Sequence, residues 1–83
     1  MRVKVLFFAR LRELAGRSEW TCEVADGARV RDVWSAASAT HPSLAPFQGA
    51  VSCAINAEFA TSGAAVRDGD EVAFLPPVSG GSR

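Results

Sequence analysis

Two adjacent glycines near the end of the chain, Gly80 and Gly81, are the residues best suited to chemistry in this 83-residue sequence. Glycine has no Cβ, so its backbone can pass through a narrow channel and adopt φ angles that other residues avoid. A terminal Gly-Gly can therefore present a main-chain carboxylate as the reacting group. The alternative is an ordinary frayed end, because small residues gather at disordered termini. Taken alone, the glycine pair favours this simpler interpretation.

A strand with a stiff exit precedes the glycines and must position them. In residues 71–75, Val72 and Phe74 share one face while the residues between and beside them share the other, which is typical of a β-strand. Pro76 and Pro77 follow at once. Proline lacks the amide proton that a strand ladder needs and fixes its own φ, so the strand is expected to end there.

The prolines divide the sequence into a folded part and a tail. We expect one domain over residues 1–77 and a flexible tail over residues 78–83 that carries Gly80-Gly81. If residues 77–81 are extended, they span on the order of 17 Å. That reach is sufficient to enter the active site of another protein.

Composition excludes several classes of function. The chain is 48% hydrophobic and 22% charged, as in ordinary globular proteins, and its formal net charge is zero. A nucleic-acid-binding protein would carry a basic excess or stripe. No apolar run is long enough to span a membrane, and the N-terminal residues lack the pattern of a secretory signal. We therefore expect a cytoplasmic protein that binds neither nucleic acid nor membrane.

The thiols and the imidazole do not form a recognisable site. Cys22 and Cys53 lie far apart in apolar, alternating runs, without the neighbouring His or Cys residues of a metal site. They are expected to be buried small hydrophobic residues, with a disulfide or a reactive thiol as the alternative. His41, next to Pro42, is expected at a helix end rather than as a catalytic base. No bound metal or cofactor is predicted.

The rest of the chain predicts an α+β domain. Val30, Val33, Trp34 and Ala37 follow the spacing of an amphipathic helix that Pro42 ends. The other patterned segments are strands at residues 3–8, 20–24, 51–55 and 58–60, and a helical turn at residues 10–15. This order favours one main helix packed on one face of a mixed sheet, although periodicity alone does not select the topology. Residues 43–50 are the least patterned.

Three segments together carry a family resemblance. They are Asp68-Gly69-Asp70-Glu71-Val72-Ala73-Phe74-Leu75-Pro76-Pro77-Val78-Ser79-Gly80-Gly81, Val3-Lys4-Val5-Leu6-Phe7-Phe8-Ala9 and Arg12-Glu13-Leu14-Ala15-Gly16. In order and spacing they closely resemble the small, sulfur-carrying subunits of molybdopterin synthase (MoaD), with the thiamine sulfur carrier (ThiS) as a more distant relative. The resemblance covers nearly the whole chain, including Ile55-Asn56, and is weak through the middle.

The resemblance implies a ubiquitin-like β-grasp fold whose first and last strands pair in parallel at the centre of the sheet. On that fold, Phe8, Leu75 and Phe59 would form an exposed apolar patch near the root of the tail, and such a patch usually marks a partner surface. Arg12 would add a charged rim contact. The exit residues Pro76, Pro77 and Val78 complete the expected partner-binding set.

The resemblance also implies the chemistry. An activating enzyme related to the ubiquitin-activating type would use ATP to adenylate the Gly81 carboxylate, and a sulfur donor would convert it to a thiocarboxylate. The tail would then enter the large subunit of molybdopterin synthase, a two-plus-two assembly of small and large subunits, and give its sulfur to the pterin precursor. Gly81 would carry the reacting group and Gly80 would give clearance. The chain itself would contribute no acid, base or metal.

One departure from the family pattern is that Ser82-Arg83 follow the second glycine. While they remain, the Gly81 carbonyl is an amide without a carboxylate to adenylate. A protease removes the dipeptide, or it is a leftover of cloning, or this copy is inactive. The alternative functions are a sulfur carrier for thiamine or for tRNA thiolation, a ubiquitin-like protein modifier, and a plain interaction module.

Overall fold

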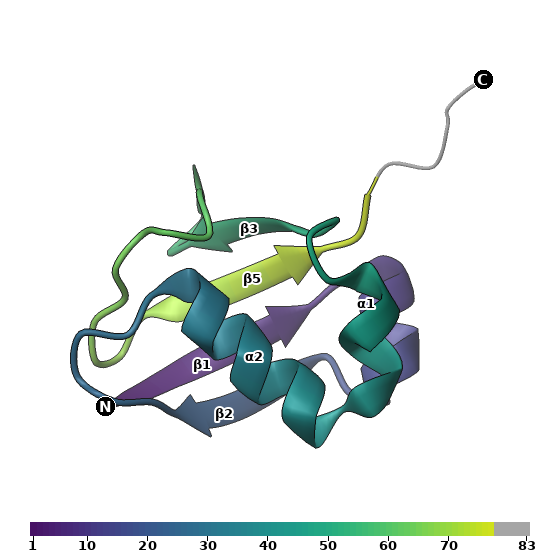
Figure 1. Ribbon diagram of the computed structural model, residues 1–83, viewed down its shortest axis with the longest axis horizontal. Helices are drawn as coiled ribbons and strands as arrows, with labels where there is room; N and C mark the ends of the chain where they lie inside the picture. Colours follow the sequence, from purple (N-terminus) through teal and green to yellow (C-terminus); the bar gives the residue numbers. More distant parts are fainter. Residues whose placement is uncertain (78–83) are drawn as a thin grey trace.

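The structure, a computed structural model, describes residues 1–77, which form a mixed sheet covered on one face by helices (Figure 1). The elements along the chain are β1 (Arg2–Phe7), α1 (Ala9–Ala15), β2 (Glu19–Glu23), α2 (Val30–Thr40), the 3₁₀ helix η1 (Pro42–Phe47), β3 (Ser52–Ile55), β4 (Glu58–Ala60) and β5 (Glu71–Leu75). This confirms the predicted order and the α+β class. Over these residues, no helix has both the length and the apolar character needed to cross a membrane.

The strand order in the sheet is β2-β1-β5-β3-β4. The central strands β1 and β5 are parallel, with Val5 opposite Val72, and every other neighbouring pair is antiparallel. The parallel centre that the resemblance implied is therefore present. It requires a long crossover between the first and last strands, and every other element of the chain, including α2, lies within that connection (Figure 1).

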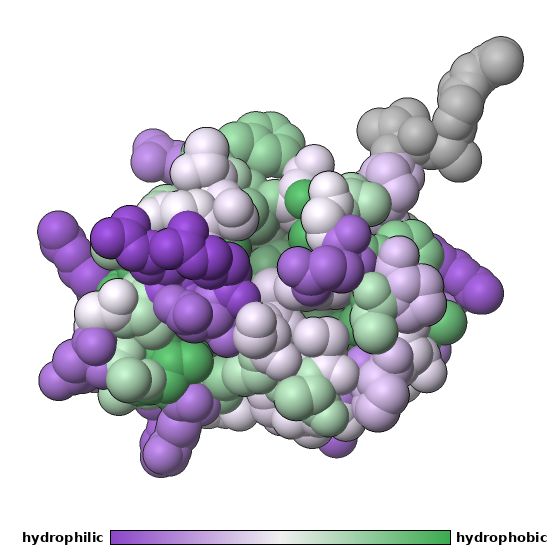
Figure 2. Space-filling model, in the orientation of Figure 1, coloured by the Kyte–Doolittle hydropathy of each residue, from purple (hydrophilic) through white to green (hydrophobic). Residues whose placement is uncertain are grey.

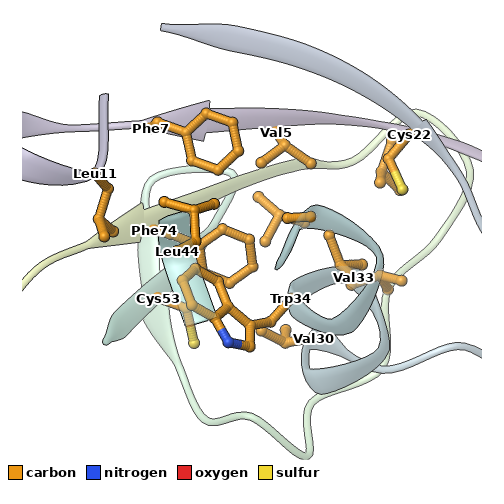
Figure 3. Close-up of a cluster of buried hydrophobic side chains, with 14 of the residues drawn as sticks. Val5, Phe7, Leu11, Cys22, Val30, Val33, Trp34, Leu44, Cys53 and Phe74 are labelled. Carbon is orange, nitrogen blue, oxygen red and sulfur yellow. The ribbon is translucent and has the colours of Figure 1, made fainter. Parts of the chain in front are cut away.

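The core lies between α2 and the sheet. The apolar stripe of α2 is buried, and its Trp34 ring packs edge to face on Phe74 of β5 at a centroid distance of 5.0 Å. Figure 3 shows Val5, Phe7 and Phe74 from the sheet meeting Val33 and Trp34 from the helix. Cys22 and Cys53 belong to the same buried cluster, so the expectation that both are buried is confirmed.

The start of α2 has no Ser, Thr, Asp or Asn at its cap position, where Arg29 stands. Instead, the Asp32 carboxylate one turn into the helix accepts a hydrogen bond of 2.8 Å from the Arg29 backbone N–H. The carboxylate also lies where the helix dipole favours negative charge. The loop after β4 accepts hydrogen bonds from two further N–H groups in the first turn of the helix. The N–H of Val30 donates to the Ala64 carbonyl, and that of Arg31 donates to the Ser62 carbonyl.

The segment with the weakest sequence pattern contains η1, which the sequence did not predict. A 3₁₀ helix has three residues per turn and is short, so it lacks the 3.6-residue apolar spacing that marks an α-helix. One residue anchors it, because Leu44 is fully buried in the core cluster, and η1 contacts α1 and α2. Pro42 occupies its first turn, where the missing amide proton is not needed.

Asn56, within the family resemblance, has a structural role. It begins the two-residue turn between β3 and β4, and both its φ of 50° and that of Ala57, 72°, are left-handed. Its Oδ1 accepts a 3.0 Å hydrogen bond from Glu71 N–H, and its Nδ2 donates to Asp70 Oδ1 at 3.0 Å. Asn56 thereby ties this turn to the start of β5.

Candidate partner-docking face

The face of the sheet turned away from α2 carries an apolar row. The register places Leu6 of β1 beside Ala73 of β5, Ala73 beside Ala54 of β3, and Ala54 beside Phe59 of β4. None of these side chains belongs to the core cluster beneath α2. Glu19 of β2, opposite Leu6, ends the row at the other edge of the sheet. Residues from every strand thus meet on one surface.

A second, shorter row lies beside the first at the carboxyl end of β5. Phe8 continues β1, and its N–H donates to the Phe74 carbonyl at 3.3 Å, which places Phe8 beside Leu75. Leu75 is half-buried and Phe8 is 43% exposed. Together with the first row they form the docking face, defined as Leu6, Phe8, Ala54, Phe59, Ala73 and Leu75.

Phe59 is more exposed than a large hydrophobic side chain in a folded protein usually is. Its side chain is 82% exposed, and with Phe8 it makes up the exposed large hydrophobic residues of the described chain. Exposed apolar area of this kind costs solubility unless a partner covers it. The structure therefore brings Phe8, Phe59 and Leu75 to one face, as predicted.

The other end of the same face is charged. Lys4 lies between Thr21 and Glu71 in the register and forms an ion pair with Glu19 at 3.7 Å. Arg2 pairs with Glu23 at 3.1 Å nearby. The apolar surface is thus confined to the end of the sheet at which the chain leaves β5.

The chain leaves the sheet at Pro76, which is half-buried, and Pro77, which is exposed. The ladder between β3 and β5 ends one residue earlier, with Leu75 opposite Ser52. This agrees with the expectation that the prolines end the strand. Val78, Gly80 and Gly81 of the predicted site lie outside the described residues.

Arg12 lies exposed on α1, and this helix contacts β5 (Figure 1). Arg10 on the same helix pairs with Glu13 at 3.0 Å, whereas Arg12 forms no ion pair within residues 1–77. The Phe8 carbonyl accepts hydrogen bonds from the backbone of Leu11 and Arg12 and so holds α1 against the docking face. A free cation beside an apolar surface can contribute to the rate and orientation of association.

The described residues show no group arranged for acid–base or nucleophilic chemistry. Burial raises the pKa of both thiols, with the Glu23 charge adding to the effect on Cys22, so they are protonated at neutral pH. The His41 ring lies against Phe7 and Trp20, and its Nδ1 is 2.9 Å from the Ala37 carbonyl. Over residues 1–77, no three His, Cys, Asp or Glu side chains are grouped to hold a metal ion.

The sequence analysis missed Ala54 as a member of the docking face. Its neighbour Cys53 points into the core, so the alternation within β3 would have placed Ala54 on the opposite face. The small side chains of Ala54 and Ala73 keep the centre of the face flat, which leaves Phe8, Phe59 and Leu75 as its prominent residues.

Comparison with known proteins agrees with this geometry. The model of the ThiS family matches residues 5–81. The molybdopterin synthase sulfur carrier subunit of Chlamydomonas reinhardtii is 43% identical over 83 residues, covering 98% of this chain and all of that protein. The crystal structure of SAMP1 from Haloferax volcanii superposes with a TM-score of 0.88 at 32% identity, covering 98% of this chain and all of that one, and confirms the ubiquitin-like β-grasp fold.

A further similar structure was solved together with another protein. The crystal structure of the Amycolatopsis orientalis BexX/CysO complex contains a chain with a TM-score of 0.70 and 26% identity, covering 95% of this chain and 99% of that one. The family match over nearly the whole sequence, the shared fold and the apolar face at the end of β5 agree. The chain is a member of the ThiS family.

Proposed function

We propose that the chain is the sulfur carrier of molybdopterin synthesis and transports sulfur as a thiocarboxylate on Gly81. The observation that carries this proposal is similarity over almost the entire chain to a protein named molybdopterin synthase sulfur carrier subunit. The docking face at the end of β5 supports it, because a carrier must bind its partners next to its reactive end.

The chemistry requires a free carboxylate at Gly81, so Ser82-Arg83 must first be removed by hydrolysis. The carboxylate oxygen then attacks the α-phosphate of ATP, which releases pyrophosphate and leaves an acyl adenylate. A sulfur donor at the sulfide oxidation level attacks the carbonyl carbon and AMP departs, which leaves the thiocarboxylate. The activating enzyme supplies ATP and catalytic groups, and this chain supplies the acyl group.

The docking face is suited to the large subunit of molybdopterin synthase. Phe8, Phe59 and Leu75 would enter its apolar surface, and Pro76-Pro77 would direct the chain away from the sheet toward its active site. Arg12 would contribute at the rim. The BexX/CysO complex, in which a similar chain is bound to a second protein, supports a protein partner of this kind. We expect the assembly to be a two-plus-two heterotetramer in the cytoplasm.

Mass spectrometry of the reconstituted carrier tests the proposal. A chain ending at Gly81, mixed with the activating enzyme, ATP and a sulfur donor, is expected to gain the mass difference between oxygen and sulfur. A chain lacking Gly81 and a chain still ending in Arg83 are expected to remain unchanged, while Ser79→Ala serves as a matched tail control that loads normally. Failure of the Gly81-terminated chain to gain sulfur would refute the carrier role.

A second candidate function is protein modification, which the match to the small archaeal modifier protein 1 structures favours. In this case the activated Gly81 would form an isopeptide bond with lysines of other proteins. Conjugates of higher mass on a denaturing gel would support it, and their absence would favour the carrier role alone. Lys4 is the single lysine of the chain, so Lys4→Arg separates self-conjugates through a side chain from conjugates with other proteins.

A further inference from the structure

A cavity of about 490 Å³ lies on the α2 side of the sheet, opposite the docking face. One wall is the connection from η1 to β3, which contains Gln48 and Val51, and the other is the segment of Thr61 and Ser62 after β4. Figure 2, which views this side, shows hydrophobic surface set back between more hydrophilic side chains near the top of the molecule. The proposed carrier function does not use this cavity.

The floor of the cavity is apolar and its polar groups are satisfied. Val30, Trp34, Cys53 and Phe74 line it, and Figure 3 shows Trp34 of α2 lying close to Cys53 and Val30. The indole N–H of Trp34 donates to Gln48 Oε1 at 2.8 Å, and Cys53 Sγ donates to the Ala60 carbonyl at 3.0 Å. A floor without a free donor or acceptor suits an apolar side chain rather than a polar ligand.

One edge of the cavity is an open strand. The two-residue turn makes Ile55 and Glu58 the hydrogen-bonded pair, so the next pair, Ala54 and Phe59, is a non-hydrogen-bonded one. The N–H and C=O groups of Phe59 therefore point away from β3, toward the free edge of the sheet. An extended peptide can pair with such groups by β-augmentation.

The rim of the cavity carries a cation without an acidic partner. Arg31 lines the cavity from the first turn of α2, and its guanidinium nitrogen lies 3.7 Å from the position of a Cβ built on Gly63. Arg2, Lys4 and Arg10 each pair with a glutamate, but Arg31 forms no ion pair with any residue that the structure describes. The carboxylate of a bound segment would pair with the Arg31 guanidinium through charge-assisted hydrogen bonds.

From these three features we propose that the cavity binds an extended, acidic segment of a partner protein. A large apolar side chain of the segment fills the cavity above Trp34, and its main chain pairs with β4 at Phe59. A carboxylate two residues along the segment, on the same face of the extended chain, binds Arg31. The cavity opens on the α2 side of the sheet and the docking face lies on the other side, and Phe59 borders both.

Two-dimensional NMR of the isotope-labelled full chain tests the inference. The probe is a capped synthetic peptide in which tryptophan and aspartate occupy every second position in turn, with threonine between them, so that both share one face of the extended chain. We expect titration to shift the indole N–H of Trp34 and the amides of Phe59 to Ser62, while the indole of Trp20, which lies outside the cavity, stays in place as an internal reference. No shift at Trp34 with roughly 1 mM peptide, the weak end of specific binding, would overturn the proposal.

Charge reversal tests the assigned carboxylate contact. Arg31→Glu is expected to weaken the aspartate peptide about tenfold and to bind the matching lysine peptide instead. Arg67→Glu is the matched control, since Arg67 is also exposed and lies outside the cavity, and it should leave both affinities unchanged. Equal weakening by both variants would mean only a long-range charge effect and would refute the site. Concentration-dependent shifts at Trp34 without peptide would assign the cavity to a second copy of the chain, and would also refute it.

Discussion

At the scale of single residues, the exposure of Phe59 is the strongest argument for the proposed docking face. An 82% exposed phenylalanine buries little apolar area, so it contributes little to the stability of the free chain. Folding stability therefore does not explain a phenylalanine at this sheet edge. Its register position beside Ala54 connects it to Leu6 and Ala73, and through them to Phe8 and Leu75. Its role is therefore expected to lie in binding.

The first prediction separates binding from stability at this position. Phe59→Ser should leave the free energy of unfolding within about 0.5 kcal/mol of the parent, because the side chain is exposed. It should weaken binding to the large synthase subunit about tenfold or more, as truncation of an aromatic anchor does. Calorimetric titration and urea unfolding measure the two quantities, and Thr21→Ala, exposed on the charged side of the same face, is the control. Unaltered affinity would contradict the assignment of the docking face.

The two thiols make a second prediction at the residue scale. Burial raises the pKa of Cys53, and burial with the Glu23 charge raises that of Cys22, above the ordinary value of 9.0. Between the unfolded and folded pKa values the native state binds more protons than the unfolded state, so stability falls as pH rises. The contribution is fully present below about pH 9 and decreases above it.

Alkylation measures how accessible the two thiols are in the native protein. Near neutral pH both cysteines should react with iodoacetamide far more slowly in the native protein than in urea. The urea midpoint of the parent should decline above about pH 9 more steeply than that of the Cys22→Ala, Cys53→Ala double variant. Rapid labelling of the native protein near neutral pH would show that one thiol is accessible, against the burial in the structure.

At the scale of elements, the turn between β3 and β4 departs from ordinary turn chemistry. Two-residue hairpin turns with both φ angles positive favour Asn followed by Gly, and here the second position is Ala57 at a φ of 72°. A β-carbon in this conformation is strained, because it approaches the following carbonyl oxygen.

Ala57→Gly should therefore stabilise the protein by about 0.5–1 kcal/mol, since relief of the left-handed strain exceeds the extra backbone entropy of glycine. Urea unfolding measures the change. Ala60→Gly is the matched control within β4, where φ is not positive, and it should have the opposite sign. A destabilising Ala57→Gly would show that the turn is not strained as described.

Asn56 makes a prediction of its own, because its side chain joins this turn to β5. Asn56→Asp loses the donor to Asp70 and places two carboxylates side by side, so we expect a loss of about 1–3 kcal/mol at neutral pH. The loss should shrink at about pH 4 and below, where protonation allows one carboxyl to donate to the other. Urea unfolding at the two pH values measures this. A loss independent of pH, like that expected of Asn56→Ala, would contradict the charge explanation.

The elements themselves were predictable to different degrees. The strands and α2 were confirmed because alternation and the Val30, Val33, Trp34, Ala37 stripe each reflect burial on one face only. The helix η1 was missed, because a single buried residue, Leu44, positions it and leaves no period to detect. The cavity beside it was also beyond prediction, since its walls come from segments that pattern analysis treats as loops.

At the scale of the whole molecule, the packing that the structure describes ends with β5. The core cluster of the described residues is complete before Pro76, because its last member is Phe74 of β5. The expected division into a domain of residues 1–77 and a tail of residues 78–83 is still a prediction, and truncation tests it.

A chain ending at Pro77 should unfold at the same urea concentration as the full chain, within about 0.5 kcal/mol in the free energy of unfolding. It should still bind the large synthase subunit through the docking face, with reduced affinity, and should accept no sulfur. Circular dichroism during urea unfolding, together with mass spectrometry after the loading reaction, measures both properties. A clear loss of stability would show that residues 78–83 belong to the folded domain.

The sequence alone determined the local character of this protein: which segments alternate, where the helical stripe lies, where the prolines stop the last strand and which glycines follow. These properties depend on residues within a few positions of one another, so they can be predicted from the sequence. The family resemblance added the parallel centre of the sheet, which periodicity could not select.

Only the tertiary structure decided which distant residues share a surface. Leu6, Ala73, Ala54 and Phe59 form one row because strand pairing sets them side by side, although more than sixty residues separate the first two (67 positions from 6 to 73). The apolar cavity with Arg31 at its rim likewise arises where α2 meets loops before β3 and after β4. Pairing and packing bring together groups that have no fixed spacing in sequence, which is why both surfaces became visible only in the folded chain.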